Sequence, residues 1–567
     1  MGKTDNKNKR KRVRKIFLMS LMALSLFSFT MCGNQNGKTD TVGTVKTDSK
    51  TSTIATTKSG KVEGIIKDRI YTYRGIDYAE AQRFMAPKKV SSWEGVKKTV
   101  EYGNICPQAQ NSSRSEWFAG PDLKQSDNCQ NLNVWTPGLK DGKKRAVMVW
   151  LHGGGFASGS SAENYFYDGE NLSRTGDVVV VSINHRLNSM GFLDLSAYGE
   201  KYRDSANTGI MDLVAALEWI RDNIEEFGGN PDNVTIFGES GGGAKVLTLM
   251  ATPAAKGLFH KAVSESGAVE EMGMTLLPEK ATRRVGELTL EYLGLNSSDI
   301  DKIQTLPYEK ILEATRKALA KTAEEQGYKN VLTGATGLDW APKLDSYIPV
   351  EPVGEKYSEQ SRDIPLLIGT NLTEWETIPL MMGNNESIKD GNRNTWTEEQ
   401  VKEKMKEKYG ERAEKIAEAF SKAYPERKPA DALYVDSLLR KQTLKTARLK
   451  ADQKGAPVYN YIFSWDTTAM DGIPMSYHTA EIPFVFNSIK MNEKTTNGTE
   501  EAYELASKVS QAWVNFAKTG VPSAEGLPKW EPYTRENGAV MILDNKSEMK
   551  YNHEEELIRL LAPGYNF

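Results

Sequence analysis

A serine flanked by glycines is the first feature of this sequence that could do chemistry. Residues 237–243 read Phe-Gly-Glu-Ser-Gly-Gly-Gly, which places Ser240 in a Gly-x-Ser-x-Gly motif. The motif follows a predicted strand, 233–237, and precedes a predicted helix, 244–251. This strand–turn–helix setting holds a serine hydroxyl above the sheet on a tight turn, as a nucleophile elbow requires. We therefore predict Ser240 as a nucleophile, although the motif alone would also fit a glycine-rich loop.

A second glycine-rich segment could stabilise the negative charge that such a serine creates on a substrate oxygen. Residues 152–156 read His-Gly-Gly-Gly-Phe and follow a predicted strand, 145–151. Residues without side chains let backbone N–H groups approach a substrate oxygen, and one such donor contributes about 2.7–4 kcal/mol of transition-state stabilisation. The predicted donors are the N–H groups of Gly154, Gly155 and Gly241.

A serine nucleophile needs a base, and the sequence contains five histidines. His478 lies far downstream of the serine and matches the chain order serine, acid, histidine. His152 belongs to the glycine-rich segment. We expect His185 and His260 to be structural and His553 to be solvated. His478 is therefore the predicted base.

The acid that orients this base must lie between the serine and the histidine, at the carboxyl end of a strand. The predicted strand 364–369 leads into a turn that carries Glu374 and Glu376. Asp345 lies in a separate loop and is a rival. Spacing alone favours Glu374 without excluding the others.

Alternating strands and helices must position these residues. Apolar runs of strand length are separated by segments with helical periodicity, which predicts a mostly parallel sheet covered by helices. The predicted strands are 145–151, 177–184, 233–237, 364–369 and 456–465, and a predicted helix covers 209–229. The charged regions 270–330 and 397–450 predict wall or cap helices with solvated outer faces.

Composition narrows the class of protein. The chain has 567 residues, of which 73 are basic and 75 acidic, giving a net charge of -2. This balance argues against nucleic acid as a partner, because phosphate binding needs a basic excess. A hydrophobic content of 39% with 11 tryptophans suffices for a large core. We predict one catalytic domain over 57–567, and no motif implies a metal or a cofactor.

The N-terminus predicts export. A basic segment, 7–15, precedes an apolar segment, 16–31, that is short for a membrane span. Cys32 follows at once, as in a bacterial lipoprotein signal where that cysteine receives lipid. Residues 33–56 have almost nothing to bury and predict a flexible tether. We expect a signal over 1–32 and a lipid-anchored protein at the cell surface; free secretion and an uncleaved anchor are the alternatives.

Cysteine usage is sparse. Beyond Cys32 the chain contains only Cys106 and Cys129. In an oxidising compartment these two can form a disulfide, which would stabilise the fold by about 3 kcal/mol in the chain-entropy model. The alternative is a pair of free buried thiols.

Several collinear segments resemble the type-B carboxylesterase and cholinesterase-like family of α/β-hydrolases. The likeness extends over nearly the whole chain from about residue 57, and its most specific segments are WLHGGGFASG (150–159), GNPDNVTIFGESGGG (229–243) and HTAEIPFVF (478–486). The resemblance implies an α/β-hydrolase fold with helical insertions that form the pocket walls.

The same resemblance implies the roles of individual residues. It gives a catalytic triad of Ser240, Glu374 and His478, and it pairs the cysteines that match Cys106 and Cys129. Trp117 lies within the loop that this pairing would close, where it could line the substrate entrance or simply pack.

The implied activity is hydrolysis of small to medium carboxylic esters through an acyl-enzyme, without a metal or cofactor. A non-catalytic binding or adhesion protein on the same fold is one alternative. A lipase, amidase or polysaccharide deacylase using the same site is another. The segment before Arg83 is shorter than the family's usual Pro-Pro-Val-Gly stretch, and no choline site is evident. The role of Glu239 stays open between a buried structural carboxylate and an aid to catalysis.

Overall fold

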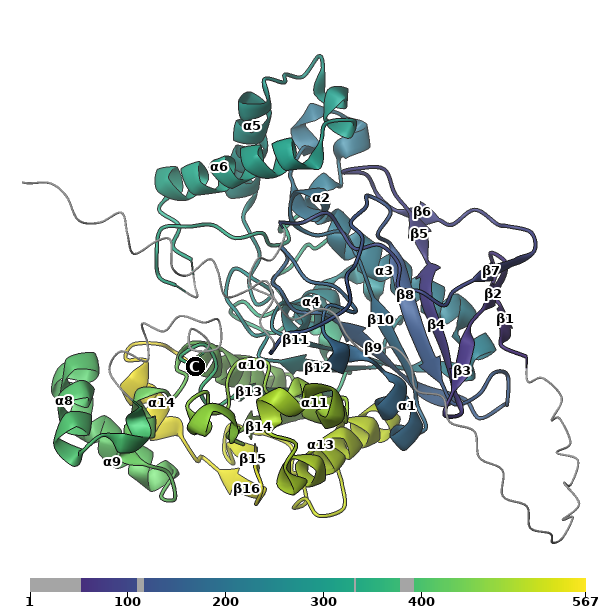
Figure 1. The fold of residues 1–567 in the computed structure, drawn as a ribbon. Helices are drawn as coiled ribbons and strands as arrows, with labels where there is room; N and C mark the ends of the chain where they lie inside the picture. Colours follow the sequence, from purple (N-terminus) through teal and green to yellow (C-terminus); the bar gives the residue numbers. More distant parts are fainter. Residues whose placement is uncertain (1–51, 110–116, 331–332, 378–391) are drawn as a thin grey trace, which may run out of the picture. The chain divides into compact units, whose positions relative to one another are not determined.

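The computed structural model describes residues 52–109, 117–330, 333–377 and 392–567. The predicted export signal, Cys32 and the tether up to residue 51 lie outside the described residues. Residues Thr53–Phe567 form one compact unit, and the architecture below is that of this unit (Figure 1).

The central element is a mostly parallel sheet, as predicted. Within the described residues it has 11 strands in the order β16-β15-β14-β13-β12-β11-β9-β10-β8-β4-β3. The strands from β10 to β15 pair in parallel, and the strands at both edges pair antiparallel. The strands are β3 Ile65–Lys67, β4 Ile70–Asp77, β8 Asn131–Thr136, β9 Arg145–Leu151, β10 Val179–Ile183, β11 Gly229–Glu239, β12 Lys261–Glu265, β13 Leu366–Asn371, β14 Val458–Phe463, β15 Ala539–Leu543 and β16 Glu548–Tyr551.

Helices and short strands complete the unit (Figure 1). The helices are α1 Glu170–Gly176, α2 Asn188–Phe192, α3 Thr208–Asn223, α4 Gly241–Ala251, α5 Glu279–Leu293, α6 Tyr308–Gln326, α8 Glu398–Tyr409, α9 Ala413–Ala423, α10 Leu438–Asp452, α11 Ile482–Val485, α12 Glu493–Thr496, α13 Glu500–Thr519 and α14 Glu555–Leu561. The small sheets are formed by β1 Ile54–Thr56, β2 Lys61–Glu63 and β7 Val96–Lys98, and by β5 Ala79–Glu80 and β6 Lys88–Lys89.

Strand β9 shows how the sheet builds two cores. All seven of its residues are buried, and successive side chains point to opposite faces. Val147 and Val149 join the cluster formed with α3 and α4, whereas Met148 and Trp150 join the cluster formed with α13. A strand that is buried on both faces has a continuously apolar sequence. This explains why the predicted strand 145–151 has the observed bounds.

The charged region 397–450 is only partly solvated. Helix α8 is mainly exposed, but α10 is buried and packs beside β13 and β14. Its Arg440 pairs with the buried Glu554. Its Lys450 donates to the backbone oxygens of Ser361 at 2.9 Å and Arg362 at 2.8 Å. The prediction of a solvated face is therefore wrong for α10, because each buried cation has a partner that the local pattern does not reveal.

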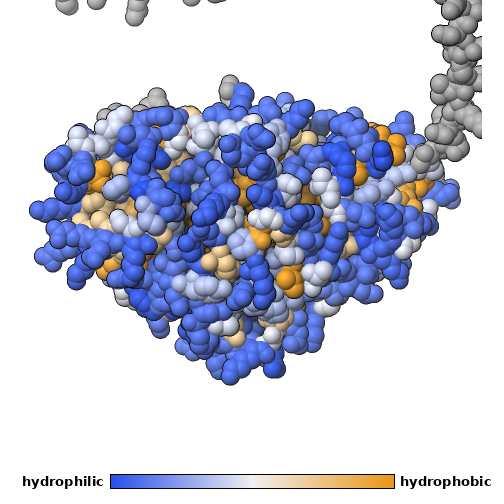
Figure 2. All heavy atoms as spheres, turned by 90° about the horizontal axis from the view of Figure 1, so that it is seen from below, coloured by the Kyte–Doolittle hydropathy of each residue, from blue (hydrophilic) through white to orange (hydrophobic). Residues whose placement is uncertain are grey.

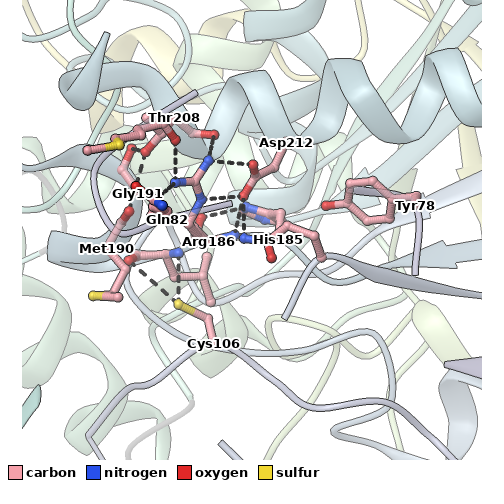
Figure 3. Close-up of polar contacts among 12 residues, drawn as sticks. Tyr78, Gln82, Cys106, His185, Arg186, Met190, Gly191, Thr208 and Asp212 are labelled. Atoms are coloured by element: carbon pink, nitrogen blue, oxygen red, sulfur yellow. Dashed lines mark hydrogen bonds and ion pairs between the residues drawn. The ribbon is translucent and has the colours of Figure 1, made fainter. Parts of the chain in front are cut away.

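The predicted disulfide between Cys106 and Cys129 is absent from the structure, which holds both as free buried thiols. Cys106 Sγ accepts a hydrogen bond from Leu187 N at 3.2 Å. Figure 3 shows this sulfur beside the chain segment of Arg186, whose guanidinium forms a buried ion pair with Asp212 at 2.7 Å. A hydrogen bond with the Cys106 thiol, together with burial, raises the pKa of Cys129. The two thiols are thus neighbours, and Cys129 favours the protonated form.

The visible surface is polar. Figure 2 shows a face dominated by hydrophilic residues, with small and separate apolar spots. Among the described residues, no helix has both the length and the apolar character needed to cross a membrane.

Candidate active site

Ser240 occupies the sharp turn between β11 and α4. Its backbone has φ 55° and ψ -125°, a strained conformation for a residue with a side chain. Its N–H donates to the backbone oxygen of Glu265 at 2.8 Å, which fixes the turn to β12. A Cβ atom on Gly242 would lie 1.9 Å from Leu151 O, so the turn requires a glycine there. The predicted strand–turn–helix setting of Ser240 is confirmed.

Glu374 and His478 meet at the same carboxyl edge of the sheet. His478 Nδ1 lies 2.6 Å from Glu374 Oε2, and both side chains are buried. The other carboxylate oxygen, Oε1, accepts Ser266 Oγ–H at 2.6 Å and Asn371 N–H at 2.7 Å. Glu374 itself has a positive φ of 37° and follows β13. The carboxylate is therefore held by two donors while it faces the imidazole.

The two rival acids, Asp345 and Glu376, contact other groups. Asp345 Oδ1 accepts the N–H groups of Tyr347 and Ile348 at 2.8 and 3.1 Å, as a turn residue. Glu376 is exposed and pairs with Lys408 at 2.9 Å. The structure thus brings Glu374, rather than either rival, to the histidine.

The free edge of the His478 ring faces the turn that carries Ser240. His478 Nε2 lies 3.2 Å from Oε1 of Glu239, the residue before Ser240. This contact lacks hydrogen-bond geometry, so Nε2 has no hydrogen-bond partner within the described residues. The indole of Trp375 stacks on the imidazole, with ring centroids 4.3 Å apart. Nε2 is therefore available for a proton from the serine turn.

The three predicted oxyanion donors lie together. Gly154 and Gly155 have φ values of 82° and 59°, which favour glycine. A Cβ atom on Gly241 would lie 2.4 Å from the N, Cα and O atoms of Gly155, so the loop and the start of α4 are in direct backbone contact. Within the described residues, the N–H groups of Gly154 and Gly155 donate to no protein acceptor. The first N–H groups of α4 are likewise free of intrahelical partners.

Comparison with known proteins places this arrangement in a family. The family model described as "Carboxylesterase family" matches residues 51–560. The chain is 34% identical over 521 residues to the para-nitrobenzyl esterase of Bacillus subtilis (strain 168), covering 91% of this chain and 99% of that protein. This chain belongs to the carboxylesterase family.

Two further carboxylesterase relatives extend the comparison. Phenmedipham hydrolase of Pseudarthrobacter oxydans is 30% identical, with 88% of this chain and 96% of that protein covered. A solved esterase from Clostridium hathewayi is 36% identical with a TM-score of 0.81, covering 89% of this chain and 97% of that one. The chain is thus a carboxylic ester hydrolase with the α/β-hydrolase fold, and a serine acyl-enzyme mechanism is general in this family.

Three further buried carboxyl groups of this carboxylesterase interact with Glu374 or with one another. Burial raises the pKa of Glu239 and Glu481 well above the ordinary range, and mutual repulsion among the carboxylates adds to the shift. Burial raises the pKa of Glu265 to about 8, while a hydrogen bond from Trp513 Nε1 at 2.7 Å opposes it. These three groups therefore favour the neutral form near pH 7, which avoids several buried charges beside Glu374.

Sequence reasoning missed Ser266, Trp375 and the carboxyls at 265 and 481. Ser266 directly follows β12, and polar residues at the carboxyl ends of parallel strands are candidates for a site. That rule would have found Ser266 and Glu265. Trp375 and Glu481 lie in loops, and no local pattern indicates that Trp375 stacks on His478 or that Glu481 joins the buried carboxyl groups.

The other histidines are structural. His152 and His185 are buried and stack on each other with centroids 5.2 Å apart, and burial lowers the pKa of both. His260 is half-buried and accepts a backbone N–H. His553 was predicted to be solvated, which is wrong: its ring packs edge-on against Tyr424, and burial lowers its pKa.

Trp117 lies close to the histidine loop. Its ring contacts Tyr477, the residue before His478, with centroids 5.8 Å apart. A separate polar cavity of about 600 Å³ lies among Arg74, Asp77, Tyr102 and neighbouring residues, none of which is a predicted site residue. Within the described residues, no group of three or more His, Cys, Asp or Glu side chains could hold a metal ion.

Proposed function

We propose that Ser240, His478 and Glu374 form the catalytic triad of this carboxylic ester hydrolase. The observation that carries the proposal is the hydrogen bond of 2.6 Å between His478 Nδ1 and Glu374 Oε2, with Nε2 turned toward the nucleophile elbow. A carboxylate on Nδ1 fixes the tautomer in which Nε2 accepts a proton.

The reaction follows from these roles. Ser240 Oγ attacks the ester carbonyl carbon while His478 Nε2 takes the hydroxyl proton. The tetrahedral intermediate collapses, the bond between the carbonyl carbon and the alcohol oxygen breaks, and the imidazolium returns its proton to the alcohol. Water, deprotonated by the same nitrogen, then attacks the acyl-enzyme carbonyl; the bond to Ser240 Oγ breaks, the imidazolium returns its proton to that oxygen, and the acid leaves. Glu374 stabilises the imidazolium in both halves.

The oxyanion of each tetrahedral intermediate would bind the N–H groups of Gly154, Gly155 and Gly241. Two of these groups have no competing acceptor among the described residues, and the third begins α4. The helix N-terminus adds positive potential at the same point. Preorganised donors of this kind need no rearrangement when the charge develops.

The substrate class we propose is small to medium carboxylic esters, including esters with an aromatic part. Trp375 stacks on the histidine and Trp117 contacts Tyr477, the residue before it, so these two partly exposed tryptophans offer aromatic surface for such a group. The relative from Clostridium hathewayi is described as hydrolysing aliphatic aromatic polyesters. A panel of p-nitrophenyl esters, benzoate esters, triglycerides and anilides would separate esterase from lipase and amidase preference.

Replacement of the serine tests the proposal. Ser240→Ala should reduce the hydrolysis of p-nitrophenyl butyrate to the background rate and abolish labelling by a fluorophosphonate probe. Ser173→Ala, a buried serine on α1 whose hydroxyl donates to Val178 O, is the control and should stay active. Unchanged turnover in folded Ser240→Ala would refute the assignment.

We also propose that the protein is exported and lipidated on Cys32. The basic and apolar segments before this cysteine support the proposal. Palmitate labelling of growing cells should mark the wild-type chain and not Cys32→Ala. Labelling that persists in the variant would contradict lipidation at this cysteine.

A further inference from the structure

A buried lysine lies behind the proposed oxyanion hole. Lys245 is on α4, one turn after Ser240, and its side chain is fully buried. Its Nζ donates a hydrogen bond of 2.9 Å to the backbone oxygen of His152. Burying an ammonium group costs free energy unless the surroundings compensate, so its position calls for a specific role.

The surroundings of Lys245 contain few charges. Its Nζ lies 5.6 Å from the centroid of the Phe156 ring. The titratable groups that interact with it are the stacked imidazoles of His152 and His185 and the carboxylate of Glu163. Burial lowers the pKa of Lys245 to about 7, while Glu163 opposes this shift. Burial, and to a smaller extent the lysine charge, lowers the pKa of both histidines, which keeps them neutral.

The acceptor of this hydrogen bond begins the glycine loop. His152 directly precedes Gly153, Gly154 and Gly155, so the Lys245 bond fixes the peptide from which the two proposed donors extend. Glycines restrain their own backbone poorly because they have a wide choice of conformations. The loop also packs on Gly241 without side chains between them. An anchor from α4 therefore ties the loop to the same helix that carries the third donor.

We propose that Lys245 is a positioning residue for the oxyanion hole, holding the 152–155 loop against α4 so that its N–H groups remain aimed at the substrate oxygen. This inference rests on the proposed function, since it takes Gly154, Gly155 and Gly241 as the donors. The hydrogen bond from α4 holds the 152–155 loop at a fixed position relative to Ser240.

Two variants separate this role from simple packing. Lys245→Met keeps the length and apolar stem but removes the donor. Lys245→Gln removes the charge and keeps an N–H donor. Lys450→Met is a matched control, because Lys450 is also fully buried and donates to backbone oxygens, but on α10. Thermal unfolding establishes that each variant is folded at the assay temperature.

The readout is the split between kcat and KM, together with the affinity for a trifluoromethyl ketone. This inhibitor forms a tetrahedral adduct whose oxyanion would occupy the hole. We expect Lys245→Met to lower kcat at least tenfold with KM within about twofold, since losing one oxyanion donor costs about 10²–10³ in kcat. Inhibitor affinity should fall by a similar factor. Lys245→Gln should recover part of both losses, and Lys450→Met should stay within twofold of wild type.

Two results would overturn the inference. One is a folded Lys245→Met enzyme with kcat within twofold of wild type. The other is a loss of kcat that leaves the affinity for the ketone unchanged. If Lys245→Met does not fold, the deciding variant is Lys245→Ala, and unchanged ketone affinity in it overturns the inference. Lys245→Gln does not separate tether from charge in that case, even if its kcat and ketone affinity are those of wild type and do not rise with added alkylammonium. Ser240→Ala assayed in parallel separates this failure from failure of the triad itself, because an active Ser240→Ala would refute the proposed function first.

Discussion

The exchange of one carboxylate oxygen for an amide nitrogen at Glu374 should disable the base without disturbing the fold. Glu374 Oε1 accepts the Ser266 hydroxyl and the Asn371 N–H, and the backbone donor cannot be reversed. In Glu374→Gln the amide oxygen must therefore occupy the Oε1 position. Its NH₂ group then replaces Oε2, 2.6 Å from His478 Nδ1. Nδ1 must accept rather than donate, which moves the ring proton to Nε2, where it blocks proton transfer from Ser240.

The expected loss follows from two contributions. Leaving the buried imidazolium without its carboxylate costs about 3–5 kcal/mol, which is a factor of roughly 10² to 10⁴ in rate. The wrong tautomer acts on the same step, and a triad with an amide in place of its carboxylate loses about 10⁴ in kcat. We therefore expect kcat for p-nitrophenyl butyrate to fall about 10⁴-fold at pH 7.5, with KM nearly unchanged.

The matched control is Glu376→Gln, because Glu376 is two residues away but exposed and paired with Lys408. It should retain wild-type kinetics. Circular dichroism and thermal unfolding establish that both variants are folded. A folded Glu374→Gln enzyme that keeps more than a few per cent of wild-type kcat would refute the reasoning, as would an equal loss in Glu376→Gln.

Three further predictions concern the surroundings of the triad. Trp375→Leu should lower kcat by about 2- to 30-fold, since a cation–π contact of about 0.5–2 kcal/mol with the imidazolium is lost. Trp375→Phe should retain most activity, and an unchanged kcat in folded Trp375→Leu would contradict this role. For Glu265, whose pKa is raised to about 8 by burial, the unfolded chain binds fewer protons than the native one between about pH 4.3 and 8, so stability falls as pH rises through this window. Glu265→Gln should show a shallower fall in the unfolding midpoint between pH 5 and 8, and parallel curves would exclude this contribution. In Cys32→Ala, denatured without reductant, Cys106 and Cys129 should both titrate as free thiols; fewer than two thiols per chain would indicate a disulfide.

The sheet was predictable wherever burial is uniform along a segment. The strand 145–151 was predicted with its observed bounds, because both of its faces are buried and its sequence is continuously apolar. The helix after Ser240 begins at Gly241, earlier than the predicted 244, because the glycines of the turn are themselves helical. Intrinsic propensity disfavours glycine in helices, and only close contact with the neighbouring backbone makes these glycines necessary.

The surroundings of the site were less predictable than its central residues. The buried charges of α10 looked like a solvated face, since their partners lie far away in the sequence. The predicted disulfide was wrong because it also depended on a contact between distant segments. Cys106 and Cys129 remain free thiols, and Cys106 Sγ accepts a hydrogen bond from the backbone N–H of Leu187.

The sequence by itself determined the nucleophile turn, the glycine loop and the family, because these depend on residue types at short and fixed spacings. Spacing left the acid open among Glu374, Glu376 and Asp345, and the resemblance favoured Glu374. Only the tertiary structure shows the Glu374 carboxylate against His478, since the three carboxylates differ in where their loops lie. It also revealed the Trp375 stack, the protonated carboxyls and the buried Lys245. These features arise from contacts between distant segments, and burial that shifts a pKa exists only once those segments have packed.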